Sequence, residues 1–324
     1  MPTNLAIVGI GRWGRVLVDA TQGHSDTVRF TRGATRTPAK AADYCAAHGI
    51  TIAQSFEELL ADPSVDGVVL ATPHSQHGDQ IRAAAEAGKH VFCEKPVTLE
   101  RADAERAMAA VEKAGVVFAP GHNRRFLPAI QHLKAMVEGG ELGTLLHIEG
   151  NMSGHVGSRY TADMWRIDPG ESPAGGLAGS GIHVIDTMIH LAGPVSSVLA
   201  QSDRLVHAIP FDDTTTFLMR FSAGPTGYVA AMTATASIFR IQVFGSKGWA
   251  ELRGETVLDH QPVDGTRVTR TFPAVSTERL QLEAFGAAIR GEAPYPIAHG
   301  DVVAGVAAFE AVPVSAKEKR WVDL

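Results

Sequence analysis

Residues 90–96 of this chain read HVFCEKP, and the predicted fold of the first part of the chain is built around them. Val91 to Cys93 form an apolar run typical of a buried parallel strand, and the run stops at a carboxylate, an amine and a proline. In an open α/β sheet, ligands bind just beyond the carboxyl ends of the strands. We therefore expect Lys95 at a ligand cleft, where its ammonium group can hold a substrate hydroxyl or oxyanion. A strand that simply ends in a solvated salt bridge is the alternative, and this stretch alone leaves both open.

The composition is that of a globular chain of 324 residues, which is too long for one ordinary core and predicts two domains. Hydrophobic residues make up 45% and charged residues 20%, as in soluble proteins. The formal net charge of −6 argues against a nucleic acid or an anionic membrane as partner. Cys45 and Cys93 show neither a disulfide framework nor zinc-site spacing, which favours the reducing cytoplasm. The N-terminus has no basic signal region, and no apolar run is long enough to cross a bilayer.

A glycine-rich turn follows the first apolar run. Residues 5–8 are followed at once by GIGRWG, residues 9–14, which matches G-x-G-x-x-G, and then by apolar residues at helical spacing. In this context the first glycine permits a tight turn, the second lets a pyrophosphate approach, and the third lets helix and strand pack closely. The helix N-terminus then offers free N–H groups to the phosphates of a dinucleotide. The cofactor-binding residues expected here are Gly9, Gly11, Arg12, Trp13 and Gly14.

Strands and helices alternate through the first 121 residues, which predicts a doubly wound parallel sheet of the α/β class, the Rossmann arrangement. The expected strands are residues 5–8, 28–31, 67–71, 91–93 and 116–119. The expected helices after the glycine turn are residues 38–47, a short helix opened by the capping box at residues 55–58, residues 77–87 and residues 99–114.

The end of the second expected strand indicates which dinucleotide binds. An NAD site usually places an Asp or Glu there, hydrogen-bonded to the ribose 2′-hydroxyl. Residues 33–38 of this chain read GATRTP, with no carboxylate, and Thr35 and Arg36 stand at the expected position. Arg36 is a natural partner for a 2′-phosphate, which favours NADP over NAD. The alternative is that Arg36 is solvated and the protein accepts both cofactors, which a comparison of KM values would decide.

The pattern changes near Gly121, which divides the chain into a dinucleotide-binding domain, residues 1–121, and a second domain, residues 122–324. After a helix with an apolar stripe, strand-like segments follow at short spacing, which predicts an α+β domain with a largely antiparallel sheet. These segments are residues 145–152, 195–201, 214–221, 227–236, 241–245, 249–252 and 268–272. We also expect a helix at residues 277–290 and a last helix that Asp301 caps and Pro313 interrupts.

Two features of the second domain are candidates for substrate contacts. Residues 155–181 form a long glycine-rich loop, a candidate lid because loops of this length are usually functional or mobile. Arg166 in this loop faces either the ligand or solvent. In the expected helix at residues 181–191, four polar residues share one face at i, i+3, i+4 and i+7, and such a stripe must meet water, a partner or a ligand. They are His183, Asp186, Thr187 and His190.

Four motifs in this order resemble the glucose–fructose oxidoreductase/inositol dehydrogenase (Gfo/Idh/MocA) family. They are GIGRWG at residues 9–14, ATPH at residues 71–74 with His77 downstream, GKHVFCEKP at residues 88–96, and the pair Gly175-Gly176 followed by GIHVID at residues 181–186. The resemblance covers nearly the whole chain. It implies NAD(P)-dependent oxidation or reduction of a sugar, polyol or related hydroxyl or carbonyl compound. It also implies an open sheet in the C-terminal domain, often used for oligomerisation, so we expect a homodimer or homotetramer.

The resemblance also assigns roles to residues. It places His183 beside the nicotinamide as an acid/base, a role that suits an imidazole because its pKa lies near neutrality. Without the resemblance, a buried structural histidine is the simpler interpretation of this residue. Lys95 shares the proton transfer and stabilises the alkoxide. Many inositol-dehydrogenase-like members carry an Asp four residues before this histidine, where this chain has Gly179. Two alternatives follow: Asp186 compensates from one turn later, or Lys95 is the main proton donor. The other expected cofactor contacts are Thr72, Pro73, His77, Glu94 and Lys95, and the expected substrate contacts are Asn123, Arg166, Asp186 and His190.

The sequence therefore predicts an NAD(P)-dependent oxidoreductase acting on CH–OH groups. We expect no metal, because His74 with His77, or His183 with His190, lack matching carboxylate or cysteine ligands. Three alternatives stay open: a dihydrodiol dehydrogenase or imine reductase of the same family, a nucleotide-sensing regulatory protein on the same fold, and a glycoside-processing enzyme that uses NAD as a hydride store. The intact Glu-Lys-Pro motif counts against the sensor, and the lack of an evident carboxylate pair counts against glycoside processing.

Overall fold

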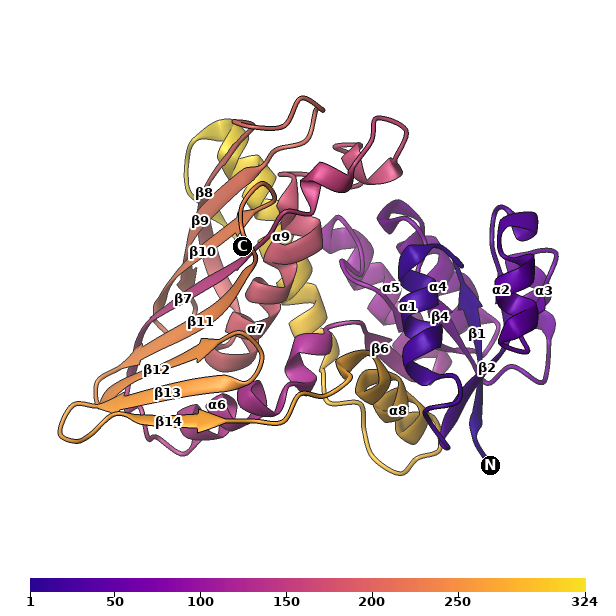
Figure 1. The fold of residues 1–324 in the computed structure, drawn as a ribbon, viewed down its shortest axis with the longest axis horizontal. Coiled ribbons are helices and arrows are strands. Elements are labelled where there is room, and N and C mark those ends of the chain that lie inside the picture. Colours follow the sequence, from indigo (N-terminus) through magenta and orange to yellow (C-terminus); the bar gives the residue numbers. More distant parts are fainter. The chain divides into compact units, whose positions relative to one another are not determined.

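The computed structural model describes all of residues 1–324, and the chain divides into two compact units (Figure 1). The first unit contains Met1–Thr98, Ala102–Asn123 and Ser276–Val302, and the second contains Leu99–Arg101, Arg124–Val275 and Val303–Leu324. The main crossing of the chain from one unit to the other lies between Asn123 and Arg124. The segment Ser276–Val302 returns to the first unit.

The first unit is built on a parallel sheet of six strands in the order β3-β2-β1-β4-β5-β6. The strands are β1 Thr3–Val8, β2 Val28–Ala34, β3 Thr51–Ile52, β4 Gly67–Leu70, β5 His90–Cys93 and β6 Phe118–Pro120. This is the strand order of a dinucleotide-binding Rossmann sheet, so the expected fold class is confirmed. The sequence pattern misses β3, because only two residues pair with β2 there and one of them is exposed.

Helices connect these strands much as the sequence predicts. They are α1 Arg12–Thr21, α2 Ala42–Ala47, α3 Phe56–Ala61, α4 His77–Glu86 and α5 Arg101–Ala114. Ser55 caps α3 as expected, since its hydroxyl accepts the backbone N–H of Glu58 at 3.2 Å. The helix expected at residues 38–47 divides into a 3-10 turn, Pro38–Lys40, and α2. Gly88 and Gly115 follow α4 and α5 in the left-handed region, with φ of 72° and 66°.

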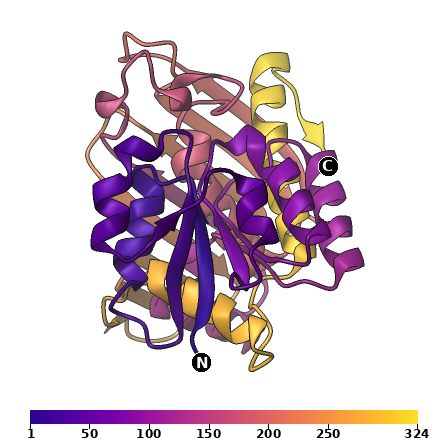
Figure 2. The ribbon, with the colours of Figure 1, turned by 90° about the vertical axis from the view of Figure 1, so that its right-hand side faces the viewer.

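The helix α8, Thr277–Ile289, packs on the first sheet although it follows the second unit in the chain (Figure 2). Phe285 is fully buried in the same core as Phe92, and the centroids of the two rings lie 6.0 Å apart. A Cβ on Gly286 would clash with Val28, so this contact requires glycine. An amphipathic pattern predicts that a helix has a buried face but not which sheet it packs against, which is why the sequence did not reveal this return.

The second unit is built on a nine-stranded sheet in the order β14-β13-β12-β11-β7-β10-β9-β8-β15. The strands are β7 Leu145–Ser153, β8 Val195–Asp203, β9 Thr214–Phe221, β10 Thr226–Met232, β11 Ile238–Gly245, β12 Gly248–Arg253, β13 Val257–Pro262, β14 Val268–Thr271 and β15 Val322–Asp323. Neighbouring strands are antiparallel except β7 and β10, so the expected largely antiparallel sheet is confirmed. The sequence pattern misses β15 and β13. Residues 259–261 of β13 read DHQ, and three consecutive polar residues are not a strand signal.

Three helices contribute to the core against this sheet: α6 Pro128–Glu138, α7 Ile182–Ala192 and the long α9 His299–Glu318. Val184 of α7 approaches β7 so closely that a Cβ on Gly150 would clash. Contrary to expectation, α9 continues through Pro313. Phe309 and Val312 are fully buried and hold the helix against the core, which offsets the backbone hydrogen bond that proline lacks. None of the helices combines the length and the apolar character that crossing a bilayer requires.

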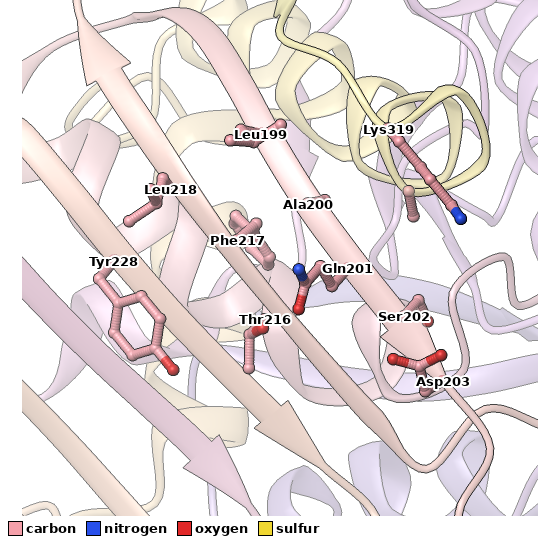
Figure 3. A pocket seen from close by; sticks show the side chains of 11 residues that line it. Leu199, Ala200, Gln201, Ser202, Asp203, Thr216, Phe217, Leu218, Tyr228 and Lys319 are labelled. Atoms are coloured by element: carbon pink, nitrogen blue, oxygen red, sulfur yellow. The ribbon is translucent and has the colours of Figure 1, made fainter.

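The outer edge of β8 is only partly covered by a strand. β15 pairs with it at Ser197 and Val198. Beyond that pair, the Ser315 hydroxyl of α9 accepts the backbone N–H of Ala200 at 2.9 Å and donates to the carbonyl of Arg320 at 2.6 Å. A serine side chain thus occupies a place in the ladder that a strand would otherwise fill. A cavity of about 730 Å³ lies alongside, and its lining includes Gln201, Asp203, Thr216, Tyr228 and Lys319 (Figure 3).

Candidate active site

The glycine turn between β1 and α1 has the geometry that a dinucleotide needs. Gly9 has φ of 94°, and a Cβ there would lie 2.6 Å from the carbonyl oxygen of Ala71. A Cβ on Gly14 would clash with the backbone of Gly9, so the close packing of helix on strand also requires glycine. Gly11, by contrast, faces open space and begins α1 without a side-chain cap, and Arg12 beside it is exposed. The first N–H groups of α1 therefore remain for a pyrophosphate.

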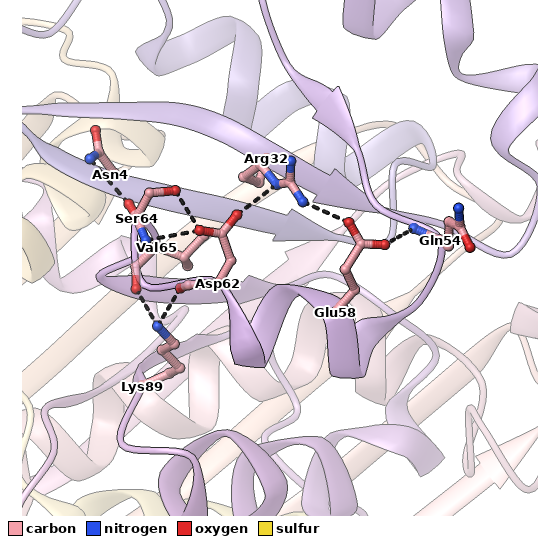
Figure 4. A network of polar contacts seen from close by, with 8 residues as sticks. All are labelled: Asn4, Arg32, Gln54, Glu58, Asp62, Ser64, Val65 and Lys89. Carbon is pink, nitrogen blue, oxygen red and sulfur yellow. Dashed lines mark hydrogen bonds and ion pairs between the residues drawn. The ribbon is translucent and has the colours of Figure 1, made fainter.

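The end of β2 carries no carboxylate. Just beyond the strand, Thr35 is half-buried and Arg36 is exposed. Two carboxylates at α3 do approach β2, but both pair with Arg32, Glu58 at 2.8 Å and Asp62 at 3.1 Å (Figure 4). The acidic side chains beside this strand are thus engaged with the protein's own arginine.

His77 connects the ends of β4 and β5. Its ring is fully buried, with Nδ1 2.9 Å from the carbonyl oxygen of Pro96 and Nε2 3.1 Å from the carbonyl oxygen of Thr72. The Thr72 hydroxyl donates to the Gln80 side chain at 2.6 Å, so α4 holds this turn at two points. Pro73, half-buried, continues the same turn. His77 is expected to contact the cofactor, but both nitrogens of its ring face backbone carbonyls of the protein.

Glu94 and Lys95 follow β5 directly, as expected. The Glu94 side chain is 5% exposed, and burial raises its pKa, an effect that the Lys95 ammonium and the Trp13 indole partly offset. The Lys95 backbone N–H donates to Oε2 of Glu94 at 3.3 Å, and Lys95 itself is half-buried. Gly121 after β6 leaves room for the carboxyl group, since a Cβ there would lie 3.0 Å from its carbon.

Asn123 lies beyond β6 and is 2% exposed. Its Nδ2 donates to Oγ1 of Thr277 at 3.1 Å and to Oε1 of Glu278 at 2.9 Å, which ties it to the first turn of α8. Its Oδ1 is buried and has no hydrogen-bond partner in the protein. The amide nitrogen therefore stabilises the fold, and the acceptor oxygen is the part of Asn123 that remains for a ligand.

His183 lies in the first turn of α7 and is 6% exposed. The residues before it, Leu177–Gly181, form one π-helical turn, a feature frequent at functional sites. Gly179 in this turn is exposed, and a Cβ there would meet no atom within 4 Å. The position four residues before His183 is therefore open in this protein.

The polar face of α7 is held by Arg125, which the sequence pattern did not single out. Its Nη2 lies 2.7 Å from Oδ1 of Asp186, and its Nε lies 3.0 Å from each carboxylate oxygen, a two-pronged contact of the strongest type. The two side chains are only 4% and 3% exposed. Nη1 of Arg125 also lies 3.4 Å from Nδ1 of half-buried His190. Asp186, the candidate to compensate for Gly179, is thus the partner of Arg125.

The long loop at residues 155–181 contains two 3-10 turns, Gly157–Arg159 and Trp165–Ile167. Arg166 is half-buried, and its guanidinium carbon lies 4.3 Å from the ring centroid of its neighbour Trp165. The ring of Tyr160 meets that of Phe211 edge-on at 5.2 Å, which joins this loop to the one between β8 and β9. Arg166 is therefore partly covered by its own loop.

Asp213 organises the loop between β8 and β9. It is 1% exposed, and its carboxylate accepts the backbone N–H groups of residues 205, 206 and 207 at 2.6–3.1 Å. Burial alone would raise the pKa of Asp213, but the hydrogen bonds from these amides and from Thr214 lower it to about 2. This carboxylate is therefore ionised and fully bonded at neutral pH.

The structure brings the expected residues together within each unit. In the first unit, the glycine turn, Thr72, Lys95 and Asn123 all follow the carboxyl ends of parallel strands. In the second unit, Asp186 and His190 share one guanidinium on the polar face of the helix that begins beside His183. No group of three or more His, Cys, Asp or Glu side chains is arranged as a metal site.

Two family descriptions match the chain. The NAD-binding Rossmann fold of the GFO_IDH_MocA oxidoreductase family matches residues 3–122, and the C-terminal domain of the same family matches residues 130–251. This chain belongs to the Gfo/Idh/MocA oxidoreductase family. Membership confirms the resemblance seen in the motifs and shows that the first unit binds a nicotinamide dinucleotide.

Members of the family with named activities match over most of their length. Myo-inositol 2-dehydrogenase of Thermotoga maritima is 28% identical over 99% of this chain and 98% of its own. A D-xylose 1-dehydrogenase (NADP(+)) of Haloferax volcanii is 28% identical over 81% of this chain and 82% of its own. Among solved structures, an oxidoreductase from Desulfitobacterium hafniense matches with a TM-score of 0.92 at 26% identity, covering 100% of this chain and 98% of that one.

Proposed function

We propose that this Gfo/Idh/MocA protein transfers a hydride between a nicotinamide cofactor and a hydroxyl or carbonyl carbon of a sugar, polyol or related compound. The observation that carries the proposal is that one unit holds both an open glycine turn at Gly11 and an amine, Lys95, at a strand end. The first fits a pyrophosphate, and the second is where α/β sheets bind their ligands. The names of the inositol and xylose relatives support the same substrate class.

In this proposal Lys95 and His183 carry the acid–base chemistry. The nicotinamide, when bound, accepts or donates the hydride. The Lys95 ammonium donates a hydrogen bond to the reacting oxygen and stabilises negative charge on it. His183 takes the hydroxyl proton when the substrate is oxidised and returns it when the substrate is reduced. The Arg125–Asp186 pair keeps α7 in one position, so that the imidazole meets the substrate in one orientation.

The variant Lys95→Ala tests this assignment. We expect kcat to fall by about 10²–10⁴-fold, because the variant loses both a proton donor and a positive charge at the reacting oxygen. NADPH binding, measured by fluorescence titration, should persist because the glycine turn is untouched. Lys113→Ala, at an exposed lysine near the end of α5, is the matched control and should turn over like the wild type. A Lys95→Ala enzyme within a few-fold of wild-type turnover would remove this residue from the mechanism.

We propose NADP as the preferred cofactor, with NAD as the alternative. Thr35 and Arg36 stand at the end of β2, and the carboxylates of Glu58 and Asp62 are paired with Arg32 rather than available to a ribose hydroxyl. The name of the Haloferax relative includes NADP. The test is the ratio of kcat/KM for the two cofactors with one substrate, which should favour NADP by at least about tenfold, or about 1.4 kcal/mol of transition-state stabilisation. A clear preference for NAD would refute the assignment.

The substrate is proposed as a class rather than a compound. Gly179 leaves open the position where many inositol-dehydrogenase-like members carry Asp, so inositol itself is less favoured than other sugars and polyols. A dye-linked screen of sugars, polyols, dihydrodiols and imines would identify it and would separate sugar oxidation from the dihydrodiol and imine alternatives. Tight cofactor binding without turnover of any panel member would instead support the nucleotide-sensing alternative, which the open Gly179 position favours.

We further propose that the protein works in the cytoplasm as a homodimer or homotetramer. Cys45 and Cys93 are both free and buried, as suits a reducing compartment. Leu218 and Tyr228 are exposed on neighbouring strands of the second sheet, at 43% and 36%. Sedimentation velocity at micromolar concentration tests the assembly, and a monomer would contradict it.

A further inference from the structure

Both ring nitrogens of His77 face hydrogen-bond acceptors. The ring is fully buried in the first turn of α4, and its two nitrogens face the carbonyl oxygens of Pro96 at 2.9 Å and Thr72 at 3.1 Å. Both contacts have the distance of an ordinary hydrogen bond. Both partners are backbone carbonyl oxygens, which accept hydrogen bonds and cannot donate them.

Only one protonation state satisfies both contacts. A neutral imidazole donates from one nitrogen and carries a lone pair on the other, whereas an imidazolium donates from both. A neutral ring would therefore set a nitrogen lone pair against a carbonyl lone pair at one of the two positions. In a buried site such a mismatch costs free energy, because a polar atom there needs a matching hydrogen-bond partner.

The two carbonyls belong to the two turns that matter for the proposed function. Thr72 follows β4, and Pro96 follows Lys95 at the end of β5. These strands are neighbours in the sheet, with Leu70 paired to Cys93. A ring that holds both carbonyls therefore fixes the position of the Lys95 turn relative to the Thr72 turn.

We propose that His77 is held as an imidazolium and that this cation is a positioning residue, which locks the turn carrying Lys95 to the turn carrying Thr72 by donating to both. The proposal rests on the proposed function in so far as Lys95 has a catalytic role. In this scheme His77 is not itself a cofactor contact, although the resemblance places it there, because both of its ring nitrogens face backbone carbonyls. It acts through the backbone, by setting where the Lys95 ammonium stands.

The surroundings show what compensates a cation here. His77 lies near the N-terminus of α4, where the helix dipole disfavours a positive charge, and the carbonyl oxygens of Pro96 and Thr72 offset part of that cost. The His74 ring lies edge-on at 5.9 Å. The side chain of Asp103 packs directly against Gly78, the next residue of α4. Asp103 is shared with Arg82 at 2.6 Å and Arg106 at 2.9 Å, and Glu94 and Lys95 lie in the turn that the ring holds.

The protonation state can be read from the wild-type protein. In ¹⁵N-histidine-labelled enzyme near pH 7.5, two-bond ¹H–¹⁵N correlation spectra distinguish an imidazolium, with two N–H nitrogens, from either neutral tautomer. We expect one histidine whose two ring nitrogens both carry slowly exchanging protons, and its signals should be absent from His77→Gln or, if that variant misfolds, from His77→Asn. A neutral tautomer for His77 would overturn the proposal. This measurement needs no turnover, so it reports the protonation state of His77 whether or not the proposed function is correct.

The positioning role is tested by kinetics. His77→Gln should lower kcat by about ten- to a hundredfold, the scale expected when a catalytic group is displaced by about 1 Å, while NADPH binding changes little. His48→Gln is the matched control, because the His48 ring also has two partners in the first unit, the Tyr44 carbonyl at 2.9 Å and Asp19 at 3.2 Å. That control should keep wild-type kcat. A His77→Gln enzyme with wild-type kcat would overturn the positioning role, whereas a wild type inactive on every substrate would instead count against the proposed function.

Discussion

Glu94 in the first unit and Asp186 in the second are both buried carboxyl groups, yet the protein treats their charges differently. Asp186 meets a guanidinium through three contacts of 2.7–3.0 Å. Glu94 has a backbone N–H at 3.3 Å and a neighbouring ammonium, which only partly offset the rise that burial causes in its pKa. A buried charge with a complete partner fixes structure, whereas one left partly compensated is sensitive to protons. The partly compensated carboxyl group, Glu94, is the one beside Lys95, the proposed catalytic lysine.

Breaking the paired charge should have the largest effect on stability. Arg125→Met leaves Asp186 buried without its partner, and we expect a loss of about 3–5 kcal/mol in the free energy of unfolding, measured by urea denaturation. The double variant Arg125→Met with Asp186→Leu removes both charges and should recover most of this loss. If the single variant lost less than about 1 kcal/mol, the pair would not be the compensated charge that the comparison assumes.

Asp213 extends the comparison to a buried carboxylate that backbone amides compensate instead of an arginine. Its pKa of about 2 lies below the ordinary value of 3.8, so Asp213→Asn should cost about 2 kcal/mol at pH 7. Because the folded-state pKa is depressed, this stabilisation is complete above pH 4 or so and is lost as the pH falls towards about 2. Urea unfolding of wild type and variant should therefore differ at pH 7 and converge near pH 2. Curves that stay equally far apart would contradict ionic bonding of this carboxylate.

Glu94→Gln should give the smallest change in the free energy of unfolding of these three variants. Unlike the other two, it should stabilise the protein rather than destabilise it. Burial raises the folded-state pKa of Glu94 above its ordinary value of 4.5, because it disfavours the charged carboxylate. The stability contributed by this group is fully present below pH 4.5 and is lost as the pH rises through the folded-state pKa. The neutral glutamine should thus match the wild type in acid and melt slightly higher at alkaline pH. A variant that is less stable throughout would show that the ionised form is needed.

Much of the first unit could be predicted from sequence, because its signals are local. A glycine turn requires particular backbone angles, as at Gly9, and a capping box requires particular side chains, as at Ser55 and Glu58. The place of Lys95 just after a strand could be predicted, because a buried strand that stops at charged residues marks the end of a parallel sheet. Each of these features depends on a few residues that are neighbours in the sequence. The sequence pattern and the structure therefore agree at these positions.

The parts that sequence missed depend on distant contacts. Arg125 appears in the chain as one of two adjacent arginines, and only folding places it against Asp186, 61 residues later. An arginine followed directly by buried Phe126 and Leu127 is the faint signal that was available. The return of α8 to the first unit and the two carbonyl contacts of His77 are of the same kind, since each depends on which elements become neighbours.

Ser315 has a consequence for the protein at high concentration. A strand at the border of a sheet is a template onto which a strand from another molecule can add, and that is a common start of aggregation. Because Ser315 occupies the N–H of Ala200 and β15 covers the positions before it, an incoming chain finds no uninterrupted row of backbone groups along β8. A single hydroxyl at the end of a helix thus helps to keep this border from seeding fibres.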